Sequence, residues 1–470
     1  MSSAGHNRYE TNAVDWSGVG GPQDVFSARQ PGWPLPRIVR GEGIYLWDDG
    51  GNRLIDVSSG PVASNLGHNN RRVVDAVRRQ VERLSFSYTR VSRTNENIAL
   101  AERIARFAGN GYERAYFVSG GSEAIEAAIM FARQRAWELG ERERTRLFSL
   151  MPSYHGGTVS ATMLSGDEGP LEMFGTMSPP SEKIPAPLTY RPPDGLTQEE
   201  NEDRSIAAFE ERLAQLGPHT VLAIFLEPVG GLATGCNVLS GRYLRRIREI
   251  CDRHGILMVF DEVMSGAGRT GRFLTAHYHR HAMPDLVVLA KGIGAGYVPF
   301  GVMLAPAAMV DPLSRGSGFN FGHTGNANPL ACAVGLAVLE EIEERGLMEN
   351  ASRVGARLAD GLRGLKRQLP VIGDVRGMGL LLAVEVVADP VTKRPFPPAS
   401  NPVAALRRHG LDNGLTIYAR RVNAGRNGDW IMTSPPLITT EAEADEIVER
   451  LGATFRAFAD EAVRDGYEVA

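Results

Sequence analysis

Short apolar runs alternate with amphipathic helical stretches through the middle of the chain, and this pattern predicts a layered α/β fold. The apolar runs have the length of buried strands and cover residues 114–120, 146–151, 220–229, 256–263 and 285–293. Between them, apolar residues recur at helical spacing over 97–109, 122–140 and 241–255. Strands that alternate with helices in this way favour a doubly wound domain with a mostly parallel sheet.

The two ends of the chain follow a different pattern. Two alternating apolar runs flank an Asp-Gly-Gly turn within 43–57, which predicts a β-hairpin. Further helices are predicted over 71–84, 329–346, 349–369, 401–414 and 439–463, and one strand over 375–387. We therefore expect three parts: residues 1–70 as an N-terminal arm and part of a small domain, 71–330 as the large domain, and 331–470 as the rest of a smaller α+β domain. Residues 166–205, rich in Pro, Glu and Gly, are expected to form a long excursion.

Composition narrows the class of protein. The chain has 470 residues, a net charge of −4 and no apolar run of the roughly 18 residues that a membrane span needs. We expect no nucleic-acid or membrane partner. Three cysteines without C-x-x-C spacing predict neither a disulfide framework nor a metal site. The residues near position 1 contain no apolar core like that of a signal peptide, so a cytoplasmic protein is expected.

Three segments carry candidate chemistry, and each also has a purely structural explanation. In FVSGGSEAIEAA (117–128) a strand passes through small residues into a helix, which suits either a phosphate or a plain serine cap. Asp261 ends an apolar strand, where a carboxylate can meet a ligand or cap a turn. Lys291 follows another buried strand, where partial desolvation makes an amine nucleophilic. The chain has only three other lysines, Lys183, Lys366 and Lys393.

Together these segments match the needs of pyridoxal 5′-phosphate (PLP). That cofactor requires an anion site, a lysine for a Schiff base and a carboxylate at its pyridine nitrogen. The carboxylate keeps the ring protonated, so that the ring can accept electrons from a carbanion.

The ordered motifs SGGSEAIEAA, SYHGGT, LEPVGG, FDEV, AKGIGAGYVPFG, GHTGNANP and SPPL resemble those of the class III (ω-type) PLP aminotransferases. The resemblance spans residues 35 to 460, nearly the whole chain. It implies the type I fold of PLP enzymes, with the large domain predicted above and a small domain built from both chain ends. It also implies a homodimer, with a tetramer left open.

The resemblance assigns roles to single residues. Lys291 would form the Schiff base and shuttle a proton, and Asp261 would pair with the pyridine nitrogen. The other cofactor contacts that it implies are Gly120, Gly121 and Ser122 at the phosphate, Val263 and Tyr154 on the two ring faces, Glu227 beside Asp261, and Thr324 reaching the phosphate from the partner subunit. Glu227 and Val263 are also ordinary residues at strand ends. His155 is expected to orient a loop rather than to take part in catalysis.

Three departures from the family pattern bear on the site. Gly120 stands where many relatives carry serine, and GHTGNANP is less aromatic than the usual interface loop. Many relatives also carry a mobile arginine after a GLxV-type strand. Here Tyr418 is near that position, and Arg420 and Arg421 follow. We choose Arg420 for the substrate carboxylate, although a surface role fits it equally well.

The predicted function is transfer of an amino group from an amine or ω-amino acid to a keto acid, with pyruvate as the acceptor expected from the family, by a ping-pong mechanism. An aminomutase, epimerase or decarboxylating enzyme of the same fold is the first alternative. A non-catalytic PLP-binding protein is the second. The donor, the stereopreference and the pathway stay open.

Overall fold

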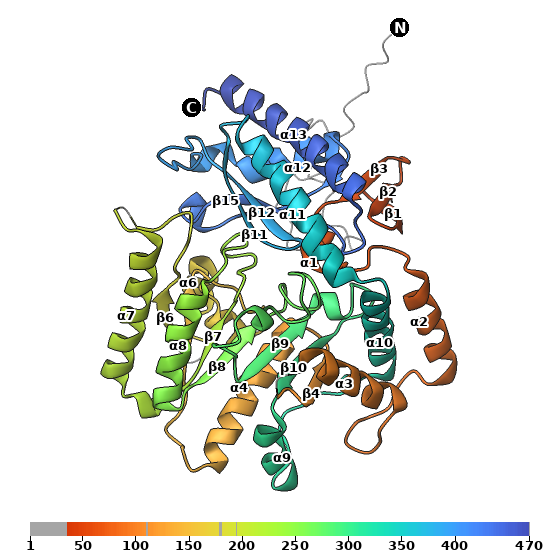
Figure 1. The fold of residues 1–470 in the computed structure, drawn as a ribbon, viewed down its shortest axis with the longest axis vertical. Helices are drawn as coiled ribbons and strands as arrows, with labels where there is room; N and C mark the ends of the chain where they lie inside the picture. The colour runs from red at the N-terminus through yellow and green to blue at the C-terminus, as the bar shows by residue number, and fades with distance from the viewer. Residues whose placement is uncertain (1–34, 110, 178–180, 194, 470) are drawn as a thin grey trace.

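The computed structural model describes residues 35–109, 111–177, 181–193 and 195–469. Its centre is a seven-stranded sheet (Figure 1). In spatial order the strands are β4 (Arg114–Val118), β10 (Gly301–Ala305), β9 (Leu286–Ala290), β8 (Leu257–Asp261), β7 (Val221–Leu226), β5 (Arg146–Met151) and β6 (Glu182–Pro185). Only β10 runs antiparallel to its neighbours, and the other pairs are parallel. The predicted mostly parallel sheet is confirmed.

Helices cover both faces of this sheet because successive strand residues point to opposite sides. Ile224 and Leu226 join one core, whereas Ala223 and Phe225 join another. The helices of the first core include α3 (Asn95–Ala108), α7 (Gln198–Leu216) and α8 (Gly241–His254), and those of the second include α4 (Gly121–Glu138) and α5 (Val159–Leu164). The sheet is therefore buried on both faces, which explains the nearly continuous apolar runs of its strands.

Two four-stranded sheets and three helices form a second body from both ends of the chain (Figure 1). One sheet contains β1 (Ile38–Glu42), β2 (Tyr45–Asp48), β3 (Arg53–Asp56) and β13 (Leu415–Thr416). The other contains β11 (Ile372–Met378), β12 (Leu381–Val386), β15 (Asp429–Thr433) and β14 (Tyr418–Arg421), and the helices are α11 (Leu347–Lys366), α12 (Pro402–Asp412) and α13 (Glu441–Arg464). Parallel pairing of Ile55 with Leu415 joins the N-terminal hairpin to the C-terminal region, as predicted for the small domain.

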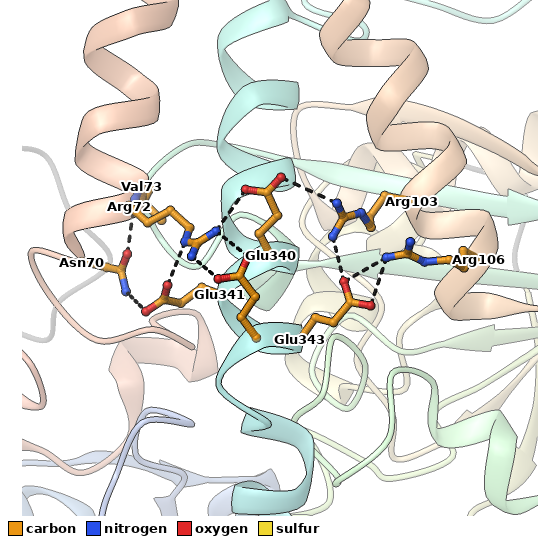
Figure 2. A network of polar contacts seen from close by, with 9 residues as sticks. Asn70, Arg72, Val73, Arg103, Arg106, Glu340, Glu341 and Glu343 are labelled. Carbon is orange, nitrogen blue, oxygen red and sulfur yellow. Dashed lines mark hydrogen bonds and ion pairs between the residues drawn. The ribbon is translucent and has the colours of Figure 1, made fainter.

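Helix α10 (Pro329–Glu344) connects the two bodies and is fixed to its neighbours by ion pairs (Figure 2). The remaining helices are α1 (Ser59–Val62), α2 (Arg71–Arg83), α6 (Glu168–Phe174) and α9 (Ala307–Arg315). Arg72 of α2 lies 3.1 Å from Glu341 of α10, and Arg103 of α3 lies 2.8 Å from Glu343. These pairs hold α10 between α2 and α3. No helix in the described part of the chain is long and apolar enough to cross a membrane.

Several predicted elements need correction. Residues 375–387 form two strands rather than one, because Gly379 adopts a left-handed φ of 59° between β11 and β12 and turns the chain back. The expected excursion 166–205 contains α6, β6 and the start of α7. Strand β10 was not predicted. The predicted arm, residues 1 to about 35, lies almost wholly outside the described residues.

Candidate active site

The carboxyl ends of the large-sheet strands line a pocket of about 380 Å³. Ligands bind at this edge of open α/β sheets, because loops there leave a crevice. Of the predicted site residues, its wall contains Gly120, Gly121, Ser122, Tyr154, Glu227, Asp261, Val263 and Lys291. Residues up to 171 positions apart in the sequence are therefore brought to one place.

The turn between β4 and α4 places backbone amides at the pocket. Helix α4 begins at Gly121, and its first N–H groups have no acceptor within the helix. A Cβ on Gly121 would lie 3.1 Å from a methyl group of Val263, so a larger residue here would have to displace that side chain slightly. The Ser122 hydroxyl accepts a hydrogen bond from the Gly157 amide at 2.9 Å and links this turn to the Tyr154 loop. The arrangement suits an anion at a helix N-terminus.

A buried carboxylate at the end of β8 is held by a histidine from the end of β5. His155 Nδ1 lies 2.8 Å from Asp261 Oδ2, and the Val263 amide donates to Asp261 Oδ1 at 3.0 Å. Both side chains are almost fully buried. His155 Nε2 has no hydrogen-bond partner among the described residues. Asp261 is thus fixed in orientation by two donors.

Glu227, at the end of β7, fixes the loops on either side of it. Its carboxylate accepts hydrogen bonds from the Tyr154 amide at 3.0 Å and the Gly231 amide at 2.8 Å. Burial raises the pKa of Glu227, and the nearby Asp261 adds to the rise. Burial also raises the pKa of the Tyr154 hydroxyl, while the positive charge of Arg420 opposes that rise. Glu227 therefore positions Tyr154 at the pocket wall through the backbone.

Lys291 is the first residue after β9 and has an unusual conformation. Its φ is 45°, in the left-handed region that non-glycine residues rarely adopt. No hydrogen bond or ion pair joins its amine to any residue that the structure describes, although it lines the pocket. Desolvation lowers the pKa of Lys291 to about 8, and the charges of Asp261 and Glu227 limit the fall. More of this amine is therefore neutral, and nucleophilic, at neutral pH than of an ordinary lysine, and the neutral form predominates above about pH 8.

Two predicted residues lie outside this wall. Arg420, on β14, donates to Asp167 Oδ2 at 2.7 Å instead of pointing to an open site. Arg421 turns to the interior of the small domain, where it donates to the Phe396 carbonyl and lies 3.5 Å from Asp429. Thr324 is not part of the pocket wall of its own chain.

A comparison with known families decides the identity of the chain. The family described as aminotransferase class-III matches residues 26–455. The chain belongs to the class III aminotransferases.

Relatives and solved structures agree with this family. The aminotransferase is 33% identical to a probable 4-aminobutyrate aminotransferase of Bacillus subtilis, over 89% of this chain and 92% of that protein. It is 32% identical to a diaminobutyrate–2-oxoglutarate transaminase of Halomonas elongata, over 91% and 92%. A PLP-bound amine transaminase from an uncultivated Pseudomonas species superposes with a TM-score of 0.85 at 35% identity, covering 93% of this chain and 97% of that one. The protein is a PLP-dependent aminotransferase with the type I fold.

The residues of the pocket fit this cofactor. A lysine amine without a partner, a buried carboxylate held by His155, and helix-terminal amides at a glycine turn are the three features that PLP requires. All three lie on strand ends of one rigid sheet, which is where precise geometry is easiest to maintain.

Sequence reasoning missed some residues that the structure places at the site. His155 was expected only to orient a loop, yet it contacts Asp261 directly. Its position immediately after a strand, next to Tyr154, was the available signal. Asp167 was missed altogether, because nothing in its sequence surroundings links it to Arg420. Leu232, which is part of the apolar wall, belongs to none of the motifs, and Phe300 lies within AKGIGAGYVPFG but was not assigned a role.

Proposed function

We propose that this aminotransferase transfers an amino group from an amine or ω-amino acid to a keto acid, with pyruvate as acceptor. The donor leaves as a carbonyl compound and pyruvate leaves as alanine, so nitrogen and hydrogen balance over two half-reactions. The observation that carries the proposal is Lys291, a desolvated amine with a lowered pKa in the same pocket as the His155–Asp261 pair.

Each side chain has a proposed task. When bound, PLP supplies an electron sink for the carbon that bears the amino group. Lys291 holds the cofactor and then moves a proton at that carbon. Asp261, oriented by His155, keeps the pyridine nitrogen protonated. The amides of Gly120 and Gly121 and the Ser122 hydroxyl hold the phosphate.

The remaining contacts define how the ring and substrate are held. Tyr154 and Val263 enclose the ring, and Glu227 fixes the Tyr154 backbone. Arg420 binds the substrate carboxylate after leaving Asp167, since a guanidinium binds either carboxylate in the same way. The positive charge of Arg420 opposes the rise in the pKa of Tyr154, a residue of the pocket wall, and this supports the proposed role.

We also propose a homodimer in which Thr324 reaches the phosphate bound by the partner subunit. The position of Thr324 outside the pocket wall of its own chain favours this arrangement. Thr324→Ala should then weaken PLP retention without changing the mass of the dimer in analytical ultracentrifugation. A monomeric wild-type enzyme with full activity would contradict the proposal. For the cell compartment we propose the cytoplasm, consistent with three cysteines that are all buried and unpaired.

The deciding experiment is an absorbance titration of the holoenzyme with a panel of amines and no acceptor. The panel contains β-alanine, 4-aminobutyrate, taurine, 1,5-diaminopentane and 1-phenylethylamine. A transaminase loses the yellow absorbance with at least one amine and regains it when pyruvate is added, with one alanine formed per carbonyl product. If the absorbance does not change with any amine, or product forms without consumption of pyruvate, the transamination proposal fails.

A further inference from the structure

The loop that follows Lys291 is packed into the core through Ile293 and Ala295, but it makes few hydrogen bonds to the rest of the protein. Residues 291–300 read KGIGAGYVPF, so Lys291 and Tyr297 are its only polar side chains. Lys291 and Ala295 both adopt a left-handed backbone, with φ of 45° and 48°. The Gly294 and Tyr297 amides donate to carbonyls within the loop itself. Such a conformation persists only where its surroundings enforce it.

The Tyr297 hydroxyl joins this loop to the rest of the protein by hydrogen bonds. It accepts a hydrogen bond from the Asn70 amide and lies 3.4 Å from the Gly67 carbonyl, to which it donates. Apart from these two bonds, the structure records no hydrogen bond between residues 292–299 and the described residues outside the loop 291–300. One phenol therefore joins the lysine loop to the segment that precedes α2.

The anchor on the far side of this bond is itself rigid. The Asn70 side chain caps α2 by accepting from the Val73 amide at 3.2 Å, and it donates to Glu341 at 3.0 Å (Figure 2). Although burial favours the neutral acid, hydrogen bonds from Arg345 and Asn70 and the charge of Arg72 hold the pKa of Glu341 below its usual value. Glu341 is thus a fixed anion on α10, and Asn70 is fixed by it.

The two segments that Tyr297 joins both contribute to the pocket wall. The lysine loop contributes Gly296, Val298, Pro299 and Phe300, and the segment before α2 contributes Pro61 and Ala63. Lys291 is the first residue of the loop, so a rotation of the loop changes where its amine points.

We propose that Tyr297 is a positioning residue for Lys291: its hydroxyl, held by Asn70, keeps the lysine amine aimed at the carbon that loses a proton. The inference rests on the proposed function, in which Lys291 moves that proton. On this proposal, the polar network of Figure 2 helps to position Lys291, because Glu341 fixes Asn70 and Asn70 holds Tyr297.

Tyr297→Phe tests this, because it removes only the hydroxyl. The matched control is Tyr278→Phe. It removes a phenol hydroxyl that donates a hydrogen bond of 3.0 Å to the Thr270 carbonyl, and Tyr278 is not part of the pocket wall. The holoenzymes are compared with pyruvate and the panel amine that wild type converts fastest, protiated or deuterated at the carbon that bears nitrogen. For Tyr297→Phe we expect kcat to fall roughly three- to tenfold, the effect of one neutral hydrogen bond. KM for the amine should stay nearly constant, and the deuterium isotope effect on kcat should rise as proton transfer becomes slower.

The isotope effect separates positioning from general damage. A variant that merely holds less folded enzyme has a lower apparent kcat with an unchanged isotope effect. If Tyr297→Phe behaves in this way, or matches Tyr278→Phe in every measurement, the inference is overturned. If the wild-type enzyme does not transaminate, the proposed function fails instead. The wild-type assay therefore distinguishes failure of the proposed function from failure of this inference.

Discussion

Replacement of Glu385 by glutamine should destabilise the fold far more than replacement of a surface glutamate. Glu385 on β12 is about 1% exposed and lies between two arginines. Its Oε1 accepts from Arg191 Nε at 2.6 Å, and its Oε2 lies 2.7 Å from Arg376 Nη1. Arg191 comes from the segment after β6 of the large sheet, so this carboxylate joins the two bodies of the molecule.

The expected magnitude follows from what each arginine retains. Removing one member of a buried ion pair costs about 3–5 kcal/mol, because it leaves an uncompensated charge. Arg376 keeps Asp374 at 3.2 Å and Arg191 keeps a hydrogen bond to the Lys393 carbonyl, so the lower end of that range, about 3 kcal/mol, is expected. The charge, rather than the shape of the side chain, is responsible, because glutamine has nearly the same volume.

Glu441→Gln is the matched control. Glu441 also lies between two arginines, Arg353 and Arg357, but on the exposed start of α13. Surface pairs of this kind contribute about 0–1 kcal/mol. Urea unfolding of both variants, with PLP in equal excess, should be followed by near-UV circular dichroism. Equal shifts of the two midpoints would refute the argument that burial gives Glu385 its importance.

The other predictions concern the active site and the pH dependence of stability. Lys291→Ala should abolish turnover and the yellow absorbance, whereas Lys393→Ala should keep both; retained activity in Lys291→Ala would disprove the assignment. In wild-type apoenzyme, the rate of PLP loading should rise up to about pH 8, the pKa of Lys291, because only the neutral amine attacks. Asp167→Asn should lower KM for pyruvate roughly two- to fivefold by freeing Arg420 from a partly exposed ion pair, and an unchanged KM in steady-state kinetics would contradict that role. Burial raises the pKa of Asp429 to about 7, above its value in the unfolded chain. Its ionisation therefore lowers the free energy of unfolding as pH rises from about 4 to 7. Asp429→Asn should flatten this pH dependence in urea titrations, and a slope identical to that of wild type would contradict the role of Asp429.

The sequence predicts most of the fold and much of the site, for a physical reason. Parallel strands buried on both faces give apolar runs, and the first polar residue after each run must lie at the same sheet edge. Asp261 and Lys291 are therefore recognisable from local sequence. Contacts between segments that are distant in the chain cannot be recognised from local sequence. Asp167 meets Arg420 across 253 positions, and Tyr297 meets Asn70 across 227. The role of Thr324 depends on a second chain and stays a prediction.

The pairing of β3 with β13 sets an order of events during synthesis. Ile55 is made 360 residues before its partner Leu415, which at 5–20 residues per second is a delay of roughly 20–70 s. During that interval the N-terminal hairpin has an unpaired edge, while the last strand of the large sheet has been synthesised once the chain reaches residue 305. The nascent chain can thus complete its cofactor-holding sheet first and close the smaller body last. A truncated product that ends before β13 would carry an open strand edge, which is a target for quality control.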